Sequence, residues 1–194
     1  GLDHPDRDRR RGRIWKITCT GKPDETVAPK QFEDFVGRDS FESTNQTVRR
    51  LAADQLVDAV GLPGAELART LLKDGRTASA RAEALWSLFR LEVLTDDDLS
   101  TAMDDQHELV RTHAFRVMAQ SPVPNARARF YLELGFQDKS PTVLRAAVTA
   151  AGVHRDPRNI TTLLSLHHRY ASDPHLRHVI RMSLRDHLAV PDWF

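Results

Sequence analysis

A short pattern recurs along this chain about once every 32 residues, and it constrains the fold more than any other feature. Each copy opens with a small or apolar residue, places an arginine one or two positions later, and continues with small and larger apolar residues. The copies begin at Val48, Ala80, Val110, Val143 and Leu176. A repeat of this length is typical of stacked helical hairpins, in which each unit covers its apolar face only with its neighbours. The pattern therefore predicts an all-α protein.

Small residues share one register of the repeat. An alanine lies four positions after the start of the first four copies, as Ala52, Ala84, Ala114 and Ala147. Small residues let neighbouring helices approach closely, and the larger apolar residue four positions further on fills the space beside them. We expect close helix packing at these positions.

Capping residues, prolines and glycines set the expected boundaries of roughly ten helices. A short helix around Phe32, Phe35 and Val36 would end at Gly37. Each repeated helix is expected to pair with the helix that follows it. The remaining helices are expected at 45–60 with Asn45 as cap, 64–73, 78–93, 96–104 after Thr95, 108–120, 125–136, from Ser140-Pro141, after Asp156-Pro157, and from Asp173-Pro174 to about Leu188.

The N-terminal segment differs from the rest. Residues 13–20 alternate polar and apolar side chains and predict a strand, and residues 21–28 have the composition of a linker. Residues 1–20 carry a charge of +3 and the remaining 174 sum to −2, which gives the chain its +1. This balance argues against a dedicated nucleic-acid binder. The only cysteine, Cys19, cannot form a disulfide or a Cys-x-x-Cys site within the chain.

Three turns place an aspartate seven residues before an arginine. We expect these acids and bases to bridge successive layers or to satisfy backbone groups at helix ends, as structural inter-repeat contacts. The residues are Asp74 and Arg81, Asp104 and Arg111, and Asp138 and Arg145. No set of residues predicts a catalytic or cofactor-binding site.

Aromatic and histidine residues offer the other candidate sites. Trp86, Phe89, Phe115, Phe130 and Tyr131 lie at helical spacing, which favours a core role over a partner-binding groove. Six of the nine histidines follow residue 150. Among them His175 and His178 have a spacing that a metal tolerates, although a surface or packing role is favoured because no clear third ligand follows.

The repeat resembles the HEAT family over about residues 29–190. In finer detail, GLDHPDRDRRRGRIWKIT, NQTVRRLAADQLVD, ARAEALWSLFRL, VRTHAFRVMAQ and DPHLRHVIRMSLRDHL resemble the middle of large planctomycete haem-binding dehydrogenase-like proteins. Those proteins join a β-propeller, a HEAT section and a c-type cytochrome, and they are exported. The resemblance implies that residues 1–20 are the remnant of a propeller's last strand, 21–28 a linker, and 29–194 a right-handed α-solenoid of about five hairpins. It also implies a periplasmic or otherwise exported location.

The leading functional hypothesis is a non-catalytic spacer and protein-interaction module, with no cofactor in this piece of the protein. Its partners would be neighbouring domains of the same chain and a protein or peptide on the concave face. The alternative is a HEAT-like DNA-binding enzyme of the alkylpurine glycosylase type, with Trp86, several arginines and an acid such as Asp54 in its groove. A bilin-lyase-like protein is a third possibility, but no specific residue supports it. No apolar run approaches the roughly 18 residues of a membrane span.

Overall fold

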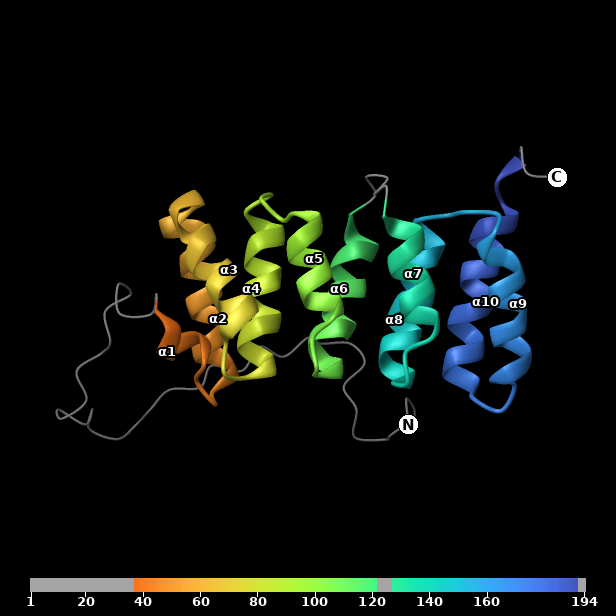
Figure 1. Ribbon diagram of the computed structural model, residues 1–194, viewed down its shortest axis with the longest axis horizontal. Helices are drawn as coiled ribbons and strands as arrows, with labels where there is room; N and C mark the ends of the chain where they lie inside the picture. The colour runs from red at the N-terminus through yellow and green to blue at the C-terminus, as the bar shows by residue number, and fades with distance from the viewer. Residues whose placement is uncertain (1–36, 122–126, 192–194) are drawn as a thin grey trace, which may run out of the picture. The chain divides into compact units, whose positions relative to one another are not determined.

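The computed structural model describes residues 37–121 and 127–191. All of them belong to one compact unit, residues 31–194. Within these ranges the regular structure is entirely helical, and no strand occurs (Figure 1). The all-α prediction is therefore confirmed for this part of the chain. The strand predicted at 13–20, the linker at 21–28 and the helix around Phe32 lie outside the described residues.

Ten α-helices form in the described ranges. Nine of them, α2 to α10, correspond to predicted helices, whereas α1 follows Gly37 and was not predicted. They are α1 (Arg38–Phe41), α2 (Gln46–Gln55), α3 (Ala65–Asp74), α4 (Ala78–Arg90), α5 (Asp96–Met103), α6 (Glu108–Gln120), α7 (Ala128–Phe136), α8 (Pro141–Val153), α9 (Asn159–Arg169) and α10 (Pro174–Leu188). A π-helical turn at Leu56–Val60 extends α2, and a 3₁₀ turn at Leu62–Gly64 leads into α3. Gly61 separates these turns with φ of 67°, a conformation that favours glycine.

Most predicted caps form, because an N-cap depends on residues only two or three positions apart. Asn45, Thr95, Ser140 and Asp173 each accept a hydrogen bond from the first turn of their helix, and Thr95 completes a capping box with Asp98. Asp156 does not cap α9, contrary to the prediction. Its carboxylate instead accepts a hydrogen bond from the Arg158 N–H, and the helix begins one residue after Arg158.

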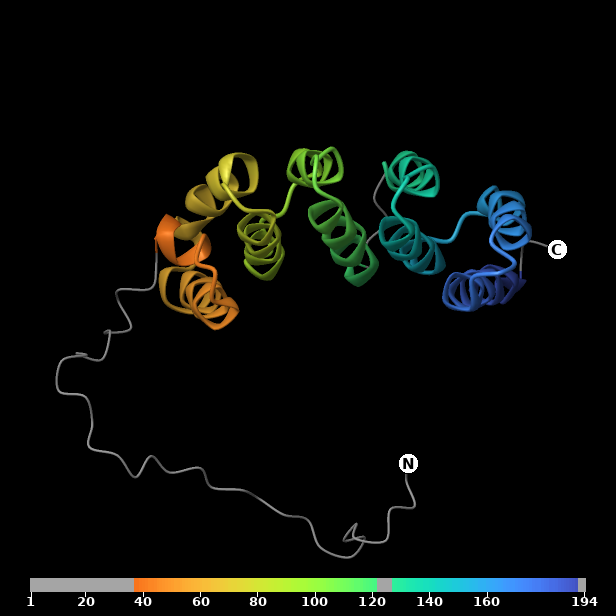
Figure 2. The same ribbon diagram turned by 90° about the horizontal axis from the view of Figure 1, so that it is seen from below.

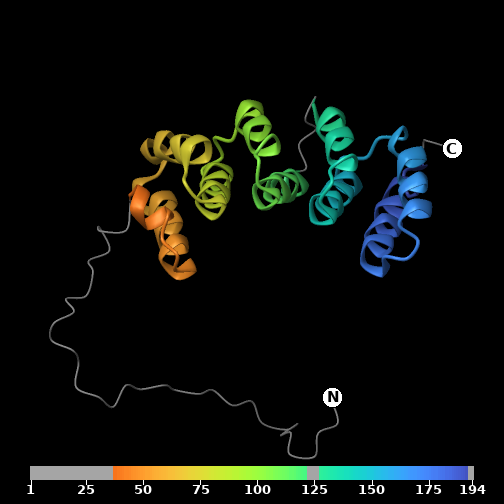
Figure 3. The same cartoon turned by 60° about the horizontal axis from the view of Figure 1, so that its bottom comes forward.

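Apart from the four-residue helix α1, the helices lie in two layers, which Figures 2 and 3 show from two directions. The five helices that carry the repeat, α2, α4, α6, α8 and α10, contact one another in chain order and form what we call the repeat layer. The second layer consists of α3, α5, α7 and α9. Because each repeat contributes one helix to this layer, equivalent positions of the repeat lie on neighbouring helices.

The pairing between layers differs from the prediction. Each second-layer helix packs mainly against the repeat helix that follows it, as α3 with α4, α5 with α6, α7 with α8 and α9 with α10. The α7–α8 contact depends on Gly135. A Cβ atom there would lie 2.4 Å from the Ala147 Cβ and 2.5 Å from the Phe115 Cζ, so only glycine permits this approach. Local sequence does not encode such a contact between helices.

The core runs between the two layers. The four repeat alanines have less than 1% of their surface exposed, and Phe115 and Tyr131 are also buried. Trp86 and Phe89 are half-buried and pack against the core. The core prediction for Phe130 is wrong, because its side chain is 57% exposed. Its neighbour Tyr131 takes the inward position on α7 and donates its hydroxyl hydrogen bond to the Asp96 carbonyl oxygen.

Among the described residues, no helix is both long enough and apolar enough to span a bilayer.

Candidate functional site

The repeat arginine has a regular structural role. In four of the five copies its Nη1 group donates to the backbone carbonyl oxygen six residues earlier, in the turn before its own helix. The bonds run from Arg49 to Ser43 (2.7 Å), Arg81 to Gly75 (2.8 Å), Arg111 to Asp105 (2.8 Å) and Arg177 to Ala171 (2.9 Å). The arginine therefore fixes the turn against the helix that follows it.

Two of these arginines also reach the next repeat. Arg81 donates from Nε and Nη2 to both carboxylate oxygens of Asp105, at 2.5 and 2.8 Å. Arg111 does the same to Asp138, at 2.7 and 3.1 Å. Both are bidentate pairs, which combine charge with fixed geometry. We call the linked set Arg81, Asp105, Arg111 and Asp138 the arginine ladder.

Each ladder aspartate is itself held by its turn. Asp105 and Asp138 accept hydrogen bonds from the backbone N–H groups of His107 and Ser140, both at 2.8 Å. Since Arg111 also bonds the Asp105 carbonyl oxygen, the contacts run without a break from the turn at Gly75 to the start of α8. The ladder thus fixes successive turns relative to one another.

The structure brings some of the predicted inter-repeat residues together, but in different pairs. Arg111 and Asp138 meet across a repeat boundary, and the partner of Arg81 is Asp105 rather than Asp74. The Asp74 backbone carbonyl accepts a weak 3.5 Å bond from Arg38. Asp104 is exposed, and Arg145 lies outside the ladder. Each ladder arginine pairs with an aspartate of the following repeat, because it lies beside the turn of that repeat.

The side chains of the ladder are largely buried. The Arg81 and Asp105 side chains are 9% and 8% exposed, and Arg111 and Asp138 are 20% and 12% exposed. The hydrogen bond to Asp105 raises the pKa of Arg81, and that to Asp138 raises the pKa of Arg111. Burial alone would raise the pKa of Asp138, but hydrogen bonds from Arg111 and Ser140 and the Arg111 charge lower it overall. Arg81, Arg111 and Asp138 are therefore charged near neutral pH.

Arg145 departs from this role because of its position in the fourth repeat. In α8 the ladder position, one residue after the repeat start, is Leu144, which is buried. Arg145 comes one residue later, which turns its side chain by about 100° around the helix. Its side chain is exposed and forms no ion pair or hydrogen bond with another described residue. The extra residue redirects this arginine toward a groove on the repeat layer.

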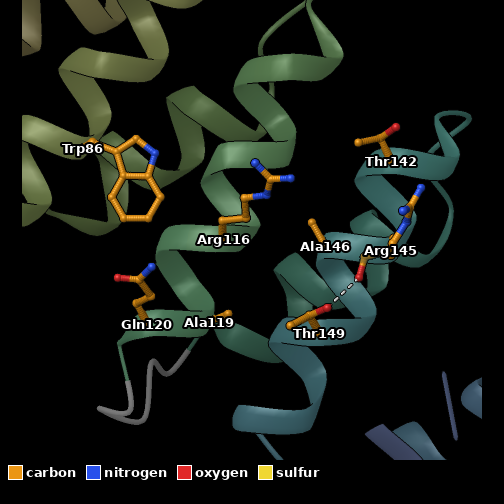
Figure 4. Close-up of a pocket in the computed structure, with 8 residues that line it drawn as sticks. All are labelled: Trp86, Arg116, Ala119, Gln120, Thr142, Arg145, Ala146 and Thr149. Carbon is orange, nitrogen blue, oxygen red and sulfur yellow. Dashed lines mark hydrogen bonds between the residues drawn. The ribbon is translucent and has the colours of Figure 1, made fainter. Parts of the chain in front are cut away.

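That groove is the candidate functional site. It has a volume of about 450 Å³ and lies along α4, α6 and α8. Figure 4 shows Trp86 on one side, Arg116 from α6 between, and the α8 residues on the other side. Its lining consists of Trp86, Arg116, Ala119, Gln120, Thr142, Arg145, Ala146 and Thr149.

Trp86 is held in place by its neighbours. Its indole Nε1–H donates to His113 Nδ1 at 2.8 Å, and its ring makes edge contacts with Phe89 and His113 at centroid distances of 5.7 and 6.1 Å. Burial and then the Arg116 charge lower the pKa of His113, so its imidazole is neutral at pH 7 and Nδ1 can accept. The groove therefore presents a pre-oriented aromatic side chain.

The charge of the groove lining is positive. Arg116, like Arg145, forms no ion pair with any residue that the structure describes, and the lining includes no aspartate or glutamate. The acid considered from the sequence, Asp54, pairs with Arg90 at 2.6 Å instead. Glu83, one turn before Trp86, is half-buried, and burial raises the pKa of its carboxyl group despite the nearby Arg49 and Arg50. Sequence reasoning considered Trp86 but missed Glu83.

The two histidines proposed as metal ligands are exposed on α10. In the described ranges, no group of three His, Cys, Asp or Glu side chains is placed to hold a metal ion. Two other C-terminal histidines have structural contacts. His154 Nε2 bonds the Met118 carbonyl oxygen at 2.8 Å, and His187 Nδ1 bonds that of Ser183 at 2.7 Å.

Comparisons with known proteins give no relative: no protein-family model matches the chain, and neither does any curated protein. The site must be interpreted from its own geometry.

Proposed function

We propose that residues 29–194 form a HEAT-like, right-handed α-solenoid that acts as a non-catalytic spacer and protein-interaction module. The single observation that carries this proposal is the arginine ladder, which links the turns of three successive repeats through two bidentate pairs. A repeated contact of this kind stabilises a linear stack, because each repeat interacts only with its neighbours.

The groove supports the binding part of the proposal. Its lining supplies an indole ring, two guanidinium groups and short polar side chains, which recognise a ligand through stacking and charge. It also lies on the layer that would form the concave face of the solenoid. Extended surfaces of that kind bind proteins and peptides in repeat proteins.

The larger context follows from the resemblance alone. In this proposal the module joins the domains of an exported dehydrogenase–cytochrome protein, and no cofactor binds within residues 29–194. The parent reading frame tests this context directly. A propeller encoded before Gly1 and a Cys-x-x-Cys-His motif encoded after Phe194 would support it.

Deletion of the last hairpin tests the solenoid. A chain that ends at His154 lacks α9 and α10 but keeps the ladder. Because stacked repeats are stabilised by nearest neighbours, we expect it to retain helical circular dichroism in proportion to its remaining helices and to unfold cooperatively. A chain that loses its helical signal altogether would instead indicate one shared core, and the solenoid proposal would fail.

A DNA-binding enzyme of the alkylpurine glycosylase type is the second candidate. The observation that favours it is Glu83, whose carboxyl group has a raised pKa. Glu83 lies one turn before Trp86, which lines the groove together with Arg116 and Arg145. Duplex DNA at about 50 mM salt tests it by electrophoretic mobility shift, since phosphate contacts are strongest at low salt. Absence of a shift at low micromolar protein would remove this candidate.

A further inference from the structure

The groove holds two positive charges that the fold does not use. Arg81 and Arg111, on the same layer, are neutralised by the aspartates of the next turn. Arg116 on α6 and Arg145 on α8 line the groove, but each lacks an ion-pair partner among residues 37–121 and 127–191. Two exposed guanidinium groups on one groove attract an anion with two acidic groups.

The aromatic wall adds a second requirement. Trp86 is half-buried, its N–H is already bonded to His113, and its ring borders the groove. An occupant must therefore supply an apolar or flat group against the indole rather than a hydrogen-bond acceptor. On the opposite side the Thr142 hydroxyl borders the groove, whereas the Thr149 hydroxyl already donates to the Arg145 backbone carbonyl oxygen at 3.0 Å (Figure 4).

The charge distribution favours a peptide over a nucleic acid. A nucleic acid needs a continuous track of cations for successive phosphates. Here residues 21–194 have a net charge of −2, and Arg90, further along α4, is neutralised by Asp54 and Asp58. A groove of about 450 Å³ with two cations matches a few residues of extended chain.

We infer that the groove between Trp86, Arg116 and Arg145 binds a short acidic segment of a partner protein, with two carboxylates on the arginines and an apolar side chain on the indole. This inference rests on the proposed interaction function and names the chemistry of its partner.

Two labelled peptides test the inference on the full chain. The first is fluorescein-Gly-Asp-Glu-Leu-Glu-Asp-Gly-amide, and the second replaces its acids with the matching amides, Asn and Gln. By fluorescence anisotropy we expect the acidic peptide to bind at least ~10-fold more tightly than the amide peptide, and binding to weaken with salt. The Trp86 indole resonance, assigned through Trp86→Phe, should shift only with the acidic peptide.

Charge reversal locates the site. In the double variant Arg116→Glu, Arg145→Glu we expect affinity for the acidic peptide to fall at least ~10-fold. The matched control is Arg50→Glu, Arg181→Glu, which changes the net charge equally at two exposed positions on α2 and α10. This control should keep the affinity within about twofold. Circular dichroism establishes that both variants fold.

Three results would overturn the inference. The first is that the two peptides bind equally well or that neither binds. The second is that both double variants lose the same affinity for the acidic peptide. The third is that a 20-base-pair duplex DNA binds through Arg116 and Arg145 more tightly than the acidic peptide does. The solenoid proposal is tested separately by the hairpin deletion, so it can stand if this binding inference fails.

Discussion

Helices α6 and α8 carry the same repeat, but their arginines do different things. In α6, Arg111 lies one residue after the repeat start and is held by the turn behind it and by Asp138 ahead of it. In α8 that position is Leu144, and Arg145 faces the groove one residue later. A shift of one residue thus separates an arginine that pairs across a repeat boundary from one that lines the groove. The regular repeats explain the fold, and the irregular one points to function.

The largest effect is expected at the most buried ladder pair. Replacement Arg81→Ala leaves the Asp105 carboxylate, 8% exposed, without its counter-charge and also removes the bond to the Gly75 carbonyl oxygen. We expect a loss of about 3–5 kcal/mol in the free energy of unfolding, measured by urea denaturation. A loss below about 1 kcal/mol would show that the ladder does not stabilise the stack.

The next effect concerns Asp138 and depends on pH. Asp138→Asn removes the charge that Arg111 and the Ser140 N–H stabilise, and we expect it to cost about 1–3 kcal/mol at pH 7. The folded pKa of Asp138 is lowered from its ordinary 3.8, so its contribution is complete above that value and is lost as the pH falls through the folded pKa. The stability difference between the natural protein and the variant should narrow below pH 3.8. A gap that does not change with pH would contradict this explanation.

A smaller effect is expected at the groove wall. His113→Phe keeps an aromatic ring beside Trp86 but removes the acceptor of its N–H, at a cost of about 1 kcal/mol. In the natural protein the bond should persist until the pH falls below 6.5, because the pKa of His113 is lowered, and should then be lost as Nδ1 is protonated. The Trp86 Nε1–H resonance reports this loss. His178→Gln, at an exposed histidine, is the control that should leave the titration unchanged.

The smallest effect completes the comparison. Arg145→Ala should change the free energy of unfolding by no more than about 0.5 kcal/mol, because the side chain is exposed and makes no ion pair with a described residue. The same measurement on Arg81→Ala provides the contrast, since both variants delete an arginine assigned to the same repeat motif. A large loss in the free energy of unfolding for Arg145→Ala would show that Arg145 stabilises the fold, as Arg81 does.

What the sequence determined by itself is the part of the fold that depends on near neighbours. Helix caps at Asn45, Thr95, Ser140 and Asp173 act over two or three residues, and the alanines of the repeat identify the buried face. These local signals were enough to predict an all-α chain and most helix boundaries. They failed where a second local contact competed, as at Asp156, whose carboxylate bonds the Arg158 N–H.

Only the tertiary structure decided which distant residues meet. Arg81 and Asp105 are 24 residues apart, and Arg111 and Asp138 are 27 apart, so their pairing depends on how each helix is rotated against the next. The same rotation places Phe130 outside the core and brings Trp86, Arg116 and Arg145 to one groove. Because successive residues of an α-helix point about 100° apart, a shift of one position changes what a side chain faces. Composition and repeat spacing do not specify how each helix is rotated against its neighbours.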